Sequence, residues 1–153
     1  MKSPNNIMTK NNLYNIKIEK APINNSKEIL KLLNSSQNLL GYKGEKFTLN
    51  EVKDYIKEKV NRVMIFKIEE KIVGIFIANF WKDYCYLYLF AVDKNYRHLG
   101  IGSRMIDYLE KNARKERYIG LITKEEDVEM INLIKKRGYI KGDKFIYYHK
   151  NLV

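Results

Sequence analysis

The spacing of hydrophobic and polar residues changes along the chain, and each change predicts a new element. Apolar and polar positions alternate over 13–20, as in a half-buried outer strand, and Pro22 ends this stretch. Apolar residues at helical spacing then follow Asn25, a residue suited to capping a helix. Thr48 and Glu51 form a capping-box pattern ahead of a second helix. The first part of the chain therefore predicts a strand and two helices.

The middle of the chain is richer in strands. Residues 62–69 and 72–80 are expected to form a hairpin, and the aromatic run 84–92 is expected to pair antiparallel with it. A helical pattern over 100–116 and an apolar segment at 118–123 complete a strand–helix–strand crossover. Such a crossover implies a parallel pair of strands.

The end of the chain predicts one more helix and a closing strand at 145–149. The helix covers 127–137 and stops at Gly138, a usual C-terminal signal. Its buried face is expected to hold Val128, Ile131 and Ile134 or Leu133. No linker or repeat divides the chain, so residues 1–153 are expected to form one domain, with a mobile start at 1–12.

The most informative stretch joins the strand at 84–92 to the next helix. From Arg97 to Gly102 the order is Arg-x-x-Gly-x-Gly, and helical spacing begins at Ile101. Backbone N–H groups at a helix start have no intrahelical partner and lie at the positive end of the helix dipole, so they can hold a phosphate. A tight turn that merely caps a helix would use the same glycines. The preceding strand and the basic turn favour the phosphate cradle.

Composition and charge narrow the classes of partner. Lys and Arg number 29 against 18 Asp and Glu, and the net charge of +11 favours anionic partners, either nucleic acid or a phosphate-bearing small ligand. Cys85 is the only cysteine, so a reducing, cytoplasmic setting is expected. No apolar run approaches the ~20 residues of a membrane span, so no membrane partner is expected.

Residues 92–105 resemble the acyl-CoA-binding motif of the GNAT superfamily of N-acetyltransferases, Arg/Gln-x-x-Gly-x-Gly/Ala. Residues 127–139 are similar to the last helix of that family, which commonly ends in Gly-Phe or Gly-Tyr. The resemblance implies a mixed α/β (α+β) fold with a mostly antiparallel sheet of six to seven strands, a parallel pair at its centre and four flanking helices. It also implies acetyl-CoA as cosubstrate without a metal, and a primary amine on a small molecule or peptide as acceptor.

The same resemblance assigns the contacts to CoA. Pantetheine amides would pair with strand backbone ending at Val92, where neighbouring strands splay apart and leave backbone groups without partners. The pyrophosphate would lie on the amides of the glycine turn. The residues expected to bind the cosubstrate are Phe90, Ala91, Val92, Arg97, His98, Leu99, Gly100, Ile101, Gly102, Ser103, Arg104 and Asp127.

Two departures from the family pattern concern catalysis. The tyrosine that many relatives use as general acid corresponds here to Ile134, and the strand at 84–92 lacks the carboxylate that many relatives carry. Tyr88 and Tyr139 are therefore named as catalytic candidates. Other replacements for the acid are Tyr147, Tyr148 and Cys85, and Glu125 and Glu126 are candidate bases. Packing explains each of these side chains as well, and catalysis by positioning alone is a further alternative.

Three functions from different classes follow. The first is acetyl transfer from acetyl-CoA to a primary amine by direct attack in a ternary complex. The second is a non-catalytic acyl-CoA-binding regulatory module, motivated by Ile134. The third is nucleic-acid binding, which rests on charge and tyrosine content and has the least support. The long connection at 34–47 is expected to be a functional loop, with a plain surface loop as the alternative. The resemblance implies that it helps to form the acceptor pocket, and a homodimer is left open.

Overall fold

Five strands form a single sheet in the order β1-β2-β3-β4-β5. The computed structural model describes residues 15–36, 46–113, 118–143 and 150, so the expectations for 1–12 and 145–149, and for most of the 34–47 connection, lie outside the described residues. The strands are β1 (Ile16–Lys20), β2 (Asn61–Ile68), β3 (Lys71–Trp81), β4 (Tyr84–Val92) and β5 (Tyr118–Leu121).

All neighbouring strands are antiparallel except β4 and β5, which are parallel as the crossover predicts. The sequence led us to expect six to seven strands, and the described residues form five. The parallel pair takes the last two positions of that described sheet, with β1 as the outer strand on the other side. The mixed α/β fold is therefore confirmed.

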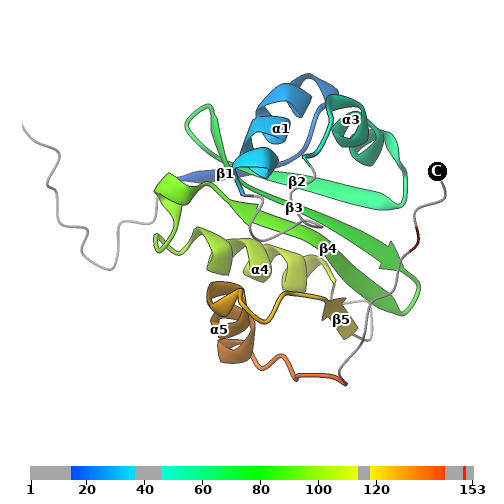
Figure 1. Cartoon of the computed structure of the whole chain (residues 1–153), viewed down its shortest axis with the longest axis vertical. Coiled ribbons are helices and arrows are strands. Elements are labelled where there is room, and N and C mark those ends of the chain that lie inside the picture. The colour runs from blue at the N-terminus through cyan, green and yellow to red at the C-terminus, as the bar shows by residue number, and fades with distance from the viewer. Residues whose placement is uncertain (1–14, 37–45, 114–117, 144–149, 151–153) are drawn as a thin grey trace, which may run out of the picture.

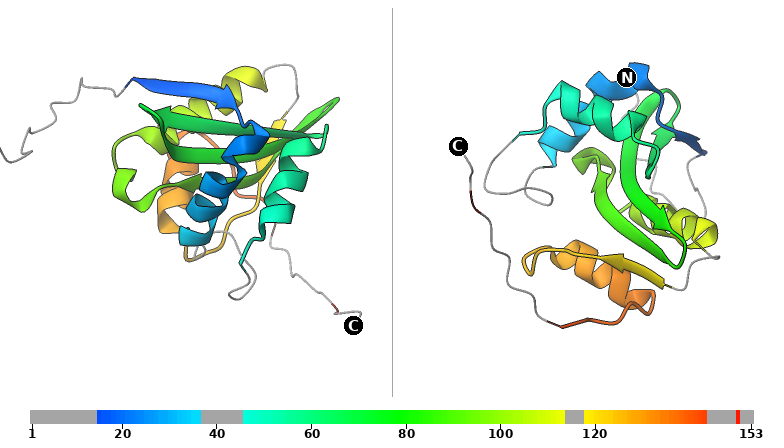
Figure 2. Two further views of the ribbon diagram at one scale, coloured as in Figure 1. Left: turned by 90° about the horizontal axis from the view of Figure 1, so that it is seen from above. Right: turned by 90° about the vertical axis from the view of Figure 1, so that its right-hand side faces the viewer.

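Helices cover both faces of the sheet (Figures 1 and 2). In the described residues these are α1 (Ser26–Ser35) and α3 (Leu49–Lys57) on one face, and α4 (Ile101–Asn112) and α5 (Val128–Lys136) on the other. Two short 3₁₀ turns, η1 (Ile23–Asn25) and η2 (Lys94–Tyr96), precede α1 and the glycine turn. The core is accordingly split into two apolar clusters. The α1-side cluster includes Ile29, Leu33, Val52, Ile65, Ile75 and Leu89. The α4-side cluster includes Phe66, Phe76, Cys85, Leu87, Met105 and Leu109.

The helix starts show which local predictions hold. At α3 the capping box is present, because Glu51 N donates to Thr48 Oγ1 at 3.2 Å and Thr48 N donates to Glu51 Oε2 at 2.6 Å. At α1, Asn25 occupies the N-cap position but its side chain makes no capping bond. Its amide instead donates to Glu28 Oε2 at 3.4 Å, and Glu28 Oε1 accepts from Ile72 N at 2.9 Å. That carboxylate therefore ties α1 to the start of β3.

The face that α5 presents to the core was only partly predicted. Met130 and Leu133 pack against the α4-side cluster, whereas Val128 is 59% exposed. Apolar residues cover a wide arc of this short helix, so periodicity alone does not single out which of them face the core. The expectation that Val128 is buried is wrong, and Leu133 is the correct member of the pair Ile134 or Leu133.

Candidate functional site

A β-bulge at Tyr88 divides β4 into two parts. Leu87 pairs with Ala78 of β3 and Leu89 pairs with Ile77, so Tyr88 is the extra residue between two ladder positions. Leu87 packs in the α4-side cluster and Leu89 in the α1-side cluster. Odd-numbered residues of β4 therefore point to the α4 side before the bulge and to the α1 side after it.

The parallel pairing of β4 with β5 ends at the same place. Its last partners are Leu87 and Leu121. In the described part of the chain, residues 89–92 pair with β3 on one side, and residues 88–92 have no paired strand on the β5 side. The strands thus separate where the sequence predicted a split.

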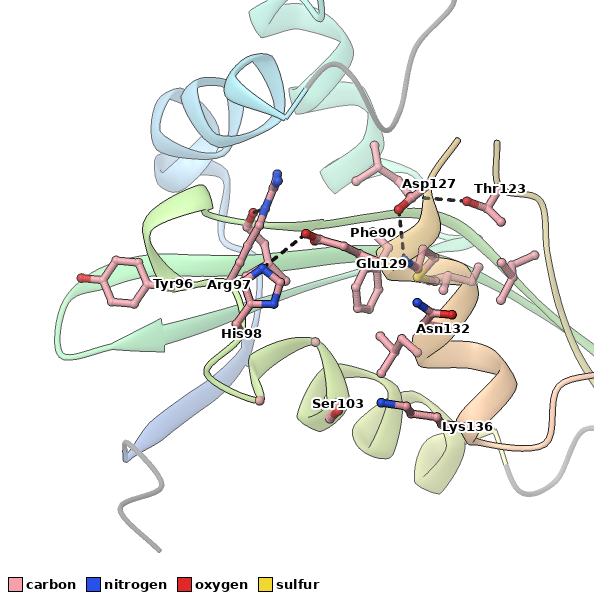
Figure 3. A pocket seen from close by; sticks show the side chains of 18 of the residues that line it. Phe90, Tyr96, Arg97, His98, Ser103, Thr123, Asp127, Glu129, Asn132 and Lys136 are labelled. Atoms are coloured by element: carbon pink, nitrogen blue, oxygen red, sulfur yellow. Dashed lines mark hydrogen bonds and ion pairs between the residues drawn. The ribbon is translucent and has the colours of Figure 1, made fainter. Parts of the chain in front are cut away.

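A pocket of about 480 Å³ occupies this split (Figure 3). Its walls come from the second half of β4, the turn into α4, the residues after β5 and one face of α5. The lining residues are Leu87, Tyr88, Leu89, Phe90, Val92, Tyr96, Arg97, His98, Gly100, Gly102, Ser103, Leu121, Ile122, Thr123, Asp127, Glu129, Met130, Asn132, Leu133 and Lys136.

The start of α4 supplies backbone donors to this pocket. The first intrahelical bond runs from Arg104 N to Gly100 O at 3.1 Å, so the amides of Ile101, Gly102 and Ser103 have no acceptor within the helix. Gly100 has a φ of +79°, a left-handed conformation that glycine adopts without strain. A Cβ on Gly102 would lie 3.4 Å from Leu133 Cδ2, so the missing side chain leaves space between the helix and the opposite wall.

Positive charge accompanies these donors. Arg97 Nε donates to Val92 O at 3.4 Å, which holds the guanidinium beside the end of β4. His98 has a φ of +61°, and its Nε2 lies 3.3 Å from Glu129 Oε1 on α5 (Figure 3). The side chains of this pair are 78% and 56% exposed, so the contact links the two walls at the surface of the pocket.

Asp93 fixes the turn before these residues. Its carboxylate accepts from Asn95 N at 2.9 Å and lies 3.0 Å from Lys71 Nζ. Burial alone would raise the pKa of Asp93, but the Asn95 amide and the Lys71 ammonium outweigh it and lower the pKa.

Replacing Asp93 separates its charge from its capping role. Asn retains the capping oxygen, so Asp93→Asn should cost less than 1 kcal/mol at pH 7, whereas Asp93→Ala also loses the cap and should cost about 1–2 kcal/mol. Because the folded-state pKa is lowered, the charge stabilises the fold above the unfolded pKa of about 3.9 and ceases to do so as the pH falls below it. Melting curves from pH 7 to pH 3 should therefore converge for wild type and Asp93→Asn. A constant gap across that range would contradict this account.

Polar contacts fix both ends of α5, which forms the far wall. Asp127 caps the helix by accepting from Met130 N at 3.0 Å, and Thr123 Oγ1 lies 3.4 Å from its other oxygen (Figure 3). At the C-terminal end, Arg137 donates to Ser103 O at 2.9 Å. The second contact joins α5 directly to the first turn of α4.

Most of the predicted cosubstrate residues meet at the pocket. Those that line it are Phe90, Val92, Arg97, His98, Gly100, Gly102, Ser103 and Asp127. Ala91 and Ile101 instead have buried side chains, and Leu99 packs on the α4-side cluster. Arg104 is not among the lining residues. At Ala91, Leu99 and Ile101, the backbone is the part of the residue that a ligand could contact, whereas the Arg104 N–H already donates to Gly100 O.

The sequence reasoning missed the polar wall formed by α5. Glu129, Asn132 and Lys136 line the pocket at spacings of three and four residues. That spacing places them on one helix face. Helical spacing of polar residues in the last helix is the sequence signal that indicates Glu129, Asn132 and Lys136.

The two tyrosine candidates lie in different places. Tyr88 lines the pocket and is 52% exposed, with its hydroxyl 3.3 Å from that of Tyr55 on α3. Burial and the neighbouring Tyr88 raise the pKa of Tyr55. Tyr139 lies in a separate groove with Glu110, and its buried hydroxyl has no hydrogen-bond partner among the described residues. Burial first, and then Glu110, raise the pKa of Tyr139. The structure therefore does not bring Tyr139 to the pocket.

Tyr147 and Tyr148 lie outside the described residues, and Cys85, Glu125 and Glu126 do not line the pocket. Cys85 is fully buried in the α4-side cluster, and Glu125 and Glu126 are exposed. Within the described ranges, no cluster of three His, Cys, Asp or Glu side chains could hold a metal ion. No described helix combines the length and the apolar character needed to cross a membrane.

Structural comparison finds the same fold in several solved proteins. A transcriptional regulator from Bacillus halodurans C-125 has a TM-score of 0.77 at 18% identity, over 88% of this chain and 99% of that one. The ribosomal-protein-S18-alanine N-acetyltransferase from Escherichia coli has a TM-score of 0.70 at 14% identity, over 84% and 79%. AAC(6')-Iy, solved with the bisubstrate analogue CoA-S-monomethyl-acetylneamine, has a TM-score of 0.73 at 13% identity, over 89% and 98%.

A search of curated protein sequences finds no match. The family model described as the acetyltransferase (GNAT) family matches residues 28–139, which include the strand split, the glycine turn and the capped last helix. The match covers most of the chain, and the fold and pocket agree with it, so this protein belongs to the GNAT family of acetyltransferases.

Proposed function

We propose that this protein transfers an acetyl group from acetyl-CoA to a primary amine by direct attack in a ternary complex. The observation that carries the proposal is the pocket in the split between β4 and β5, which opens onto the unpaired amides at the start of α4. Backbone donors beside an apolar channel suit a ligand with a phosphate at one end and an amide-containing arm at the other.

The donor set fits acetyl-CoA. The amides of Ile101, Gly102 and Ser103 would hold the pyrophosphate, with Arg97 and His98 adding positive charge. The pantetheine arm would follow residues 88–92, whose edge toward β5 has no paired strand among the described residues and offers donors and acceptors at strand spacing. On this arrangement the thioester lies near the bulge at Tyr88, at the end of the channel away from the glycine turn.

The chemistry requires a neutral amine. The nitrogen attacks the thioester carbonyl, the new C–N bond forms, the C–S bond breaks, and the thiolate takes up a proton as the amine loses one. An ordinary alkylammonium has a pKa near 10.4, so the pocket must favour its deprotonation by partial desolvation or by a water relay to the solvent. A backbone N–H of β4 next to the bulge would stabilise the negative charge that develops on the carbonyl oxygen.

Tyr88 is our candidate for the proton donor to the leaving thiolate. It lines the pocket at the bulge, and its hydroxyl lies 3.3 Å from the hydroxyl of Tyr55, which can supply or accept a proton in turn. We assign Tyr88 as the proton donor and Tyr55 as its positioning residue.

Calorimetry with acetyl-CoA, followed by a free-thiol assay over a panel of primary amines, tests the proposal. We expect one acetyl-CoA per chain and thiol release that depends on an amine. Binding without amine-dependent release would favour the acyl-CoA-binding regulatory module. Absence of acetyl-CoA binding would reject both functions.

Glu129 provides a test of where the phosphates lie. Its carboxylate lines the pocket and contacts His98, so it should oppose a nearby pyrophosphate. Glu129→Gln is expected to tighten acetyl-CoA binding by about two- to fivefold at low salt, and less at high salt. Glu125→Gln makes the same change of net charge at an exposed site outside the pocket and should leave the Kd unchanged. Equal Kd shifts in both variants would show a general charge effect instead of a local one.

A further inference from the structure

Four aromatic side chains form a row that ends at the pocket. This aromatic row consists of Trp81, Tyr84, Tyr86 and Tyr88. Trp81 and Tyr84 stack with ring centroids 5.5 Å apart and an interplanar angle of 2°, and Tyr84 and Tyr86 follow at 6.0 Å and 27°. Tyr88, at the end of the row, lines the pocket.

Strand alternation and cross-strand pairing place all four rings on one face of the sheet, because Tyr84, Tyr86 and Tyr88 are alternate residues and Trp81 of β3 pairs with Tyr84. Cys85 and Leu87 between them point into the α4-side cluster, so the alternating residues of β4 point to the α1 and α3 side. Tyr55 of α3 confirms this orientation, since its ring centroid lies 5.8 Å from that of Tyr88. Without the bulge, Leu89 would continue the buried series of the α4-side cluster.

Neighbouring residues hold the row in place. A Cβ on Gly120 would lie 2.8 Å from Tyr84 Oη, so the Tyr84 ring extends across the backbone of β5 where that strand has no side chain. Tyr118, also on β5, contacts Tyr84 at a centroid distance of 4.8 Å. The row is therefore a fixed surface that bridges the last three strands.

This surface is not an ordinary part of the core. Trp81 and Tyr88 are 49% and 52% exposed, and Tyr84 and Tyr86 are half-buried. Contiguous exposed aromatic rings beside a pocket are typical of ligand sites, because leaving them in water is unfavourable. Their faces attract planar apolar groups and, more weakly, cations.

Three carboxylates that lie near Tyr55 or line the pocket already have partners. Glu51, which contributes to the raised pKa of Tyr55, is bound in the capping box with Thr48. The pocket carboxylates Asp127 and Glu129 contact the α5 amide and His98. With a net charge of +11, the protein repels polycations at long range.

We infer that the aromatic row binds the acceptor, and that the acceptor class is a primary monoamine carrying an aromatic ring. The inference rests on the proposed acetyl transfer. A ring stacked at Tyr86 lies about 7 Å along the strand from Tyr88, so an amine on a two-carbon linker, about 5 Å from the centre of its own ring, comes within cation–π distance of Tyr88. Cation–π attraction at Tyr88 holds the ammonium until it loses its proton.

Steady-state kinetics of the full chain with three amines test this inference. Phenethylamine should have a kcat/KM at least about tenfold above that of n-butylamine, which lacks the ring, and above that of spermidine, which is a polycation. Tyr86→Leu should raise the KM for phenethylamine about tenfold and leave that for n-butylamine and the Kd for acetyl-CoA unchanged. Phe80→Leu makes a similar change on the opposite face, in the α4-side cluster, and should leave the KM for phenethylamine unchanged.

The outcomes separate this inference from the proposed function. If acetyl-CoA does not bind the wild-type protein, the proposed function itself fails. If acetyl-CoA binds and spermidine is the better substrate, or Tyr86→Leu leaves the KM for phenethylamine unchanged, the acceptor class is overturned and acetyl transfer stands. If acetyl-CoA binds without turnover of any amine, the Kd of phenethylamine for the acetyl-CoA complex, measured by calorimetry, shows whether the aromatic row binds the amine. If Tyr86→Leu raises the Kd for phenethylamine about tenfold, the aromatic row is the acceptor site. If that Kd is unchanged, the aromatic row is not the acceptor site.

Discussion

Gly102→Phe is expected to weaken acetyl-CoA binding by at least about 100-fold without unfolding the domain. The Cβ at this position would lie 3.4 Å from Leu133 Cδ2 and 3.7 Å from Phe90 Cζ, so an attached ring must occupy the channel between α4 and α5. It would also shield the amides at the helix start. A loss of this size corresponds to about 2.7 kcal/mol of binding free energy. Titration calorimetry measures the Kd directly, and the thermal midpoint verifies folding.

Two further variants bracket this result. Gly142→Phe adds the same ring where a Cβ would meet nothing within 4 Å, at an exposed position outside the pocket, and should bind acetyl-CoA as wild type does. Gly102→Ala should weaken binding only slightly, because its Cβ contacts are of ordinary length or slightly short. Normal binding by a folded Gly102→Phe protein would remove the channel from the account of cosubstrate recognition.

Phe66→Ala is expected to have the largest effect on stability, with a loss of about 3–5 kcal/mol. Phe66 of β2 is fully buried in the α4-side cluster, with its ring centroid 5.8 Å from Phe76 and 6.0 Å from Tyr108. Truncation leaves a cavity that the surrounding strands and α4 cannot close. The thermal midpoint should fall by about 6–20 °C for a domain of this size.

Tyr118→Ala is the matched control, since it truncates an aromatic residue that is 61% exposed. It should change the free energy of unfolding by less than about 1 kcal/mol. Urea unfolding of both variants gives the comparison. A loss below about 1 kcal/mol for Phe66→Ala would mean that the α4-side cluster repacks, contrary to a rigid layer between the sheet and α4.

Gly102→Phe probes the pocket at the glycine turn, and Tyr86→Leu probes the aromatic row that meets the pocket at Tyr88. The first should act on the Kd of acetyl-CoA, and the second on the KM of the amine with that Kd intact. If each variant changed both the Kd of acetyl-CoA and the KM of the amine, the cosubstrate and the acceptor would share one subsite. That result would contradict the separate subsites proposed here.

Local sequence determined much of the framework. The aromatic run 84–92 was predicted as a strand with its observed bounds, and the capping box at Thr48 was predicted with both of its bonds. The order Arg-x-x-Gly-x-Gly located the start of α4, where Gly100 adopts the positive φ that such a turn requires. These features depend on a few consecutive residues, and for that reason one sequence is enough to predict them.

Only the tertiary structure decided which side chains meet. The bulge at Tyr88 depends on how β4 pairs with β3, and no residue type within 84–92 predicts it. It reverses the alternation of the strand after Tyr88 and so turns Leu89 and Ala91 into the α1-side cluster. The packing of α5 likewise turned Lys136 toward the pocket, and Tyr139 was placed in another groove. Strand register and helix rotation are set by contacts between distant segments, so local periodicity cannot determine them.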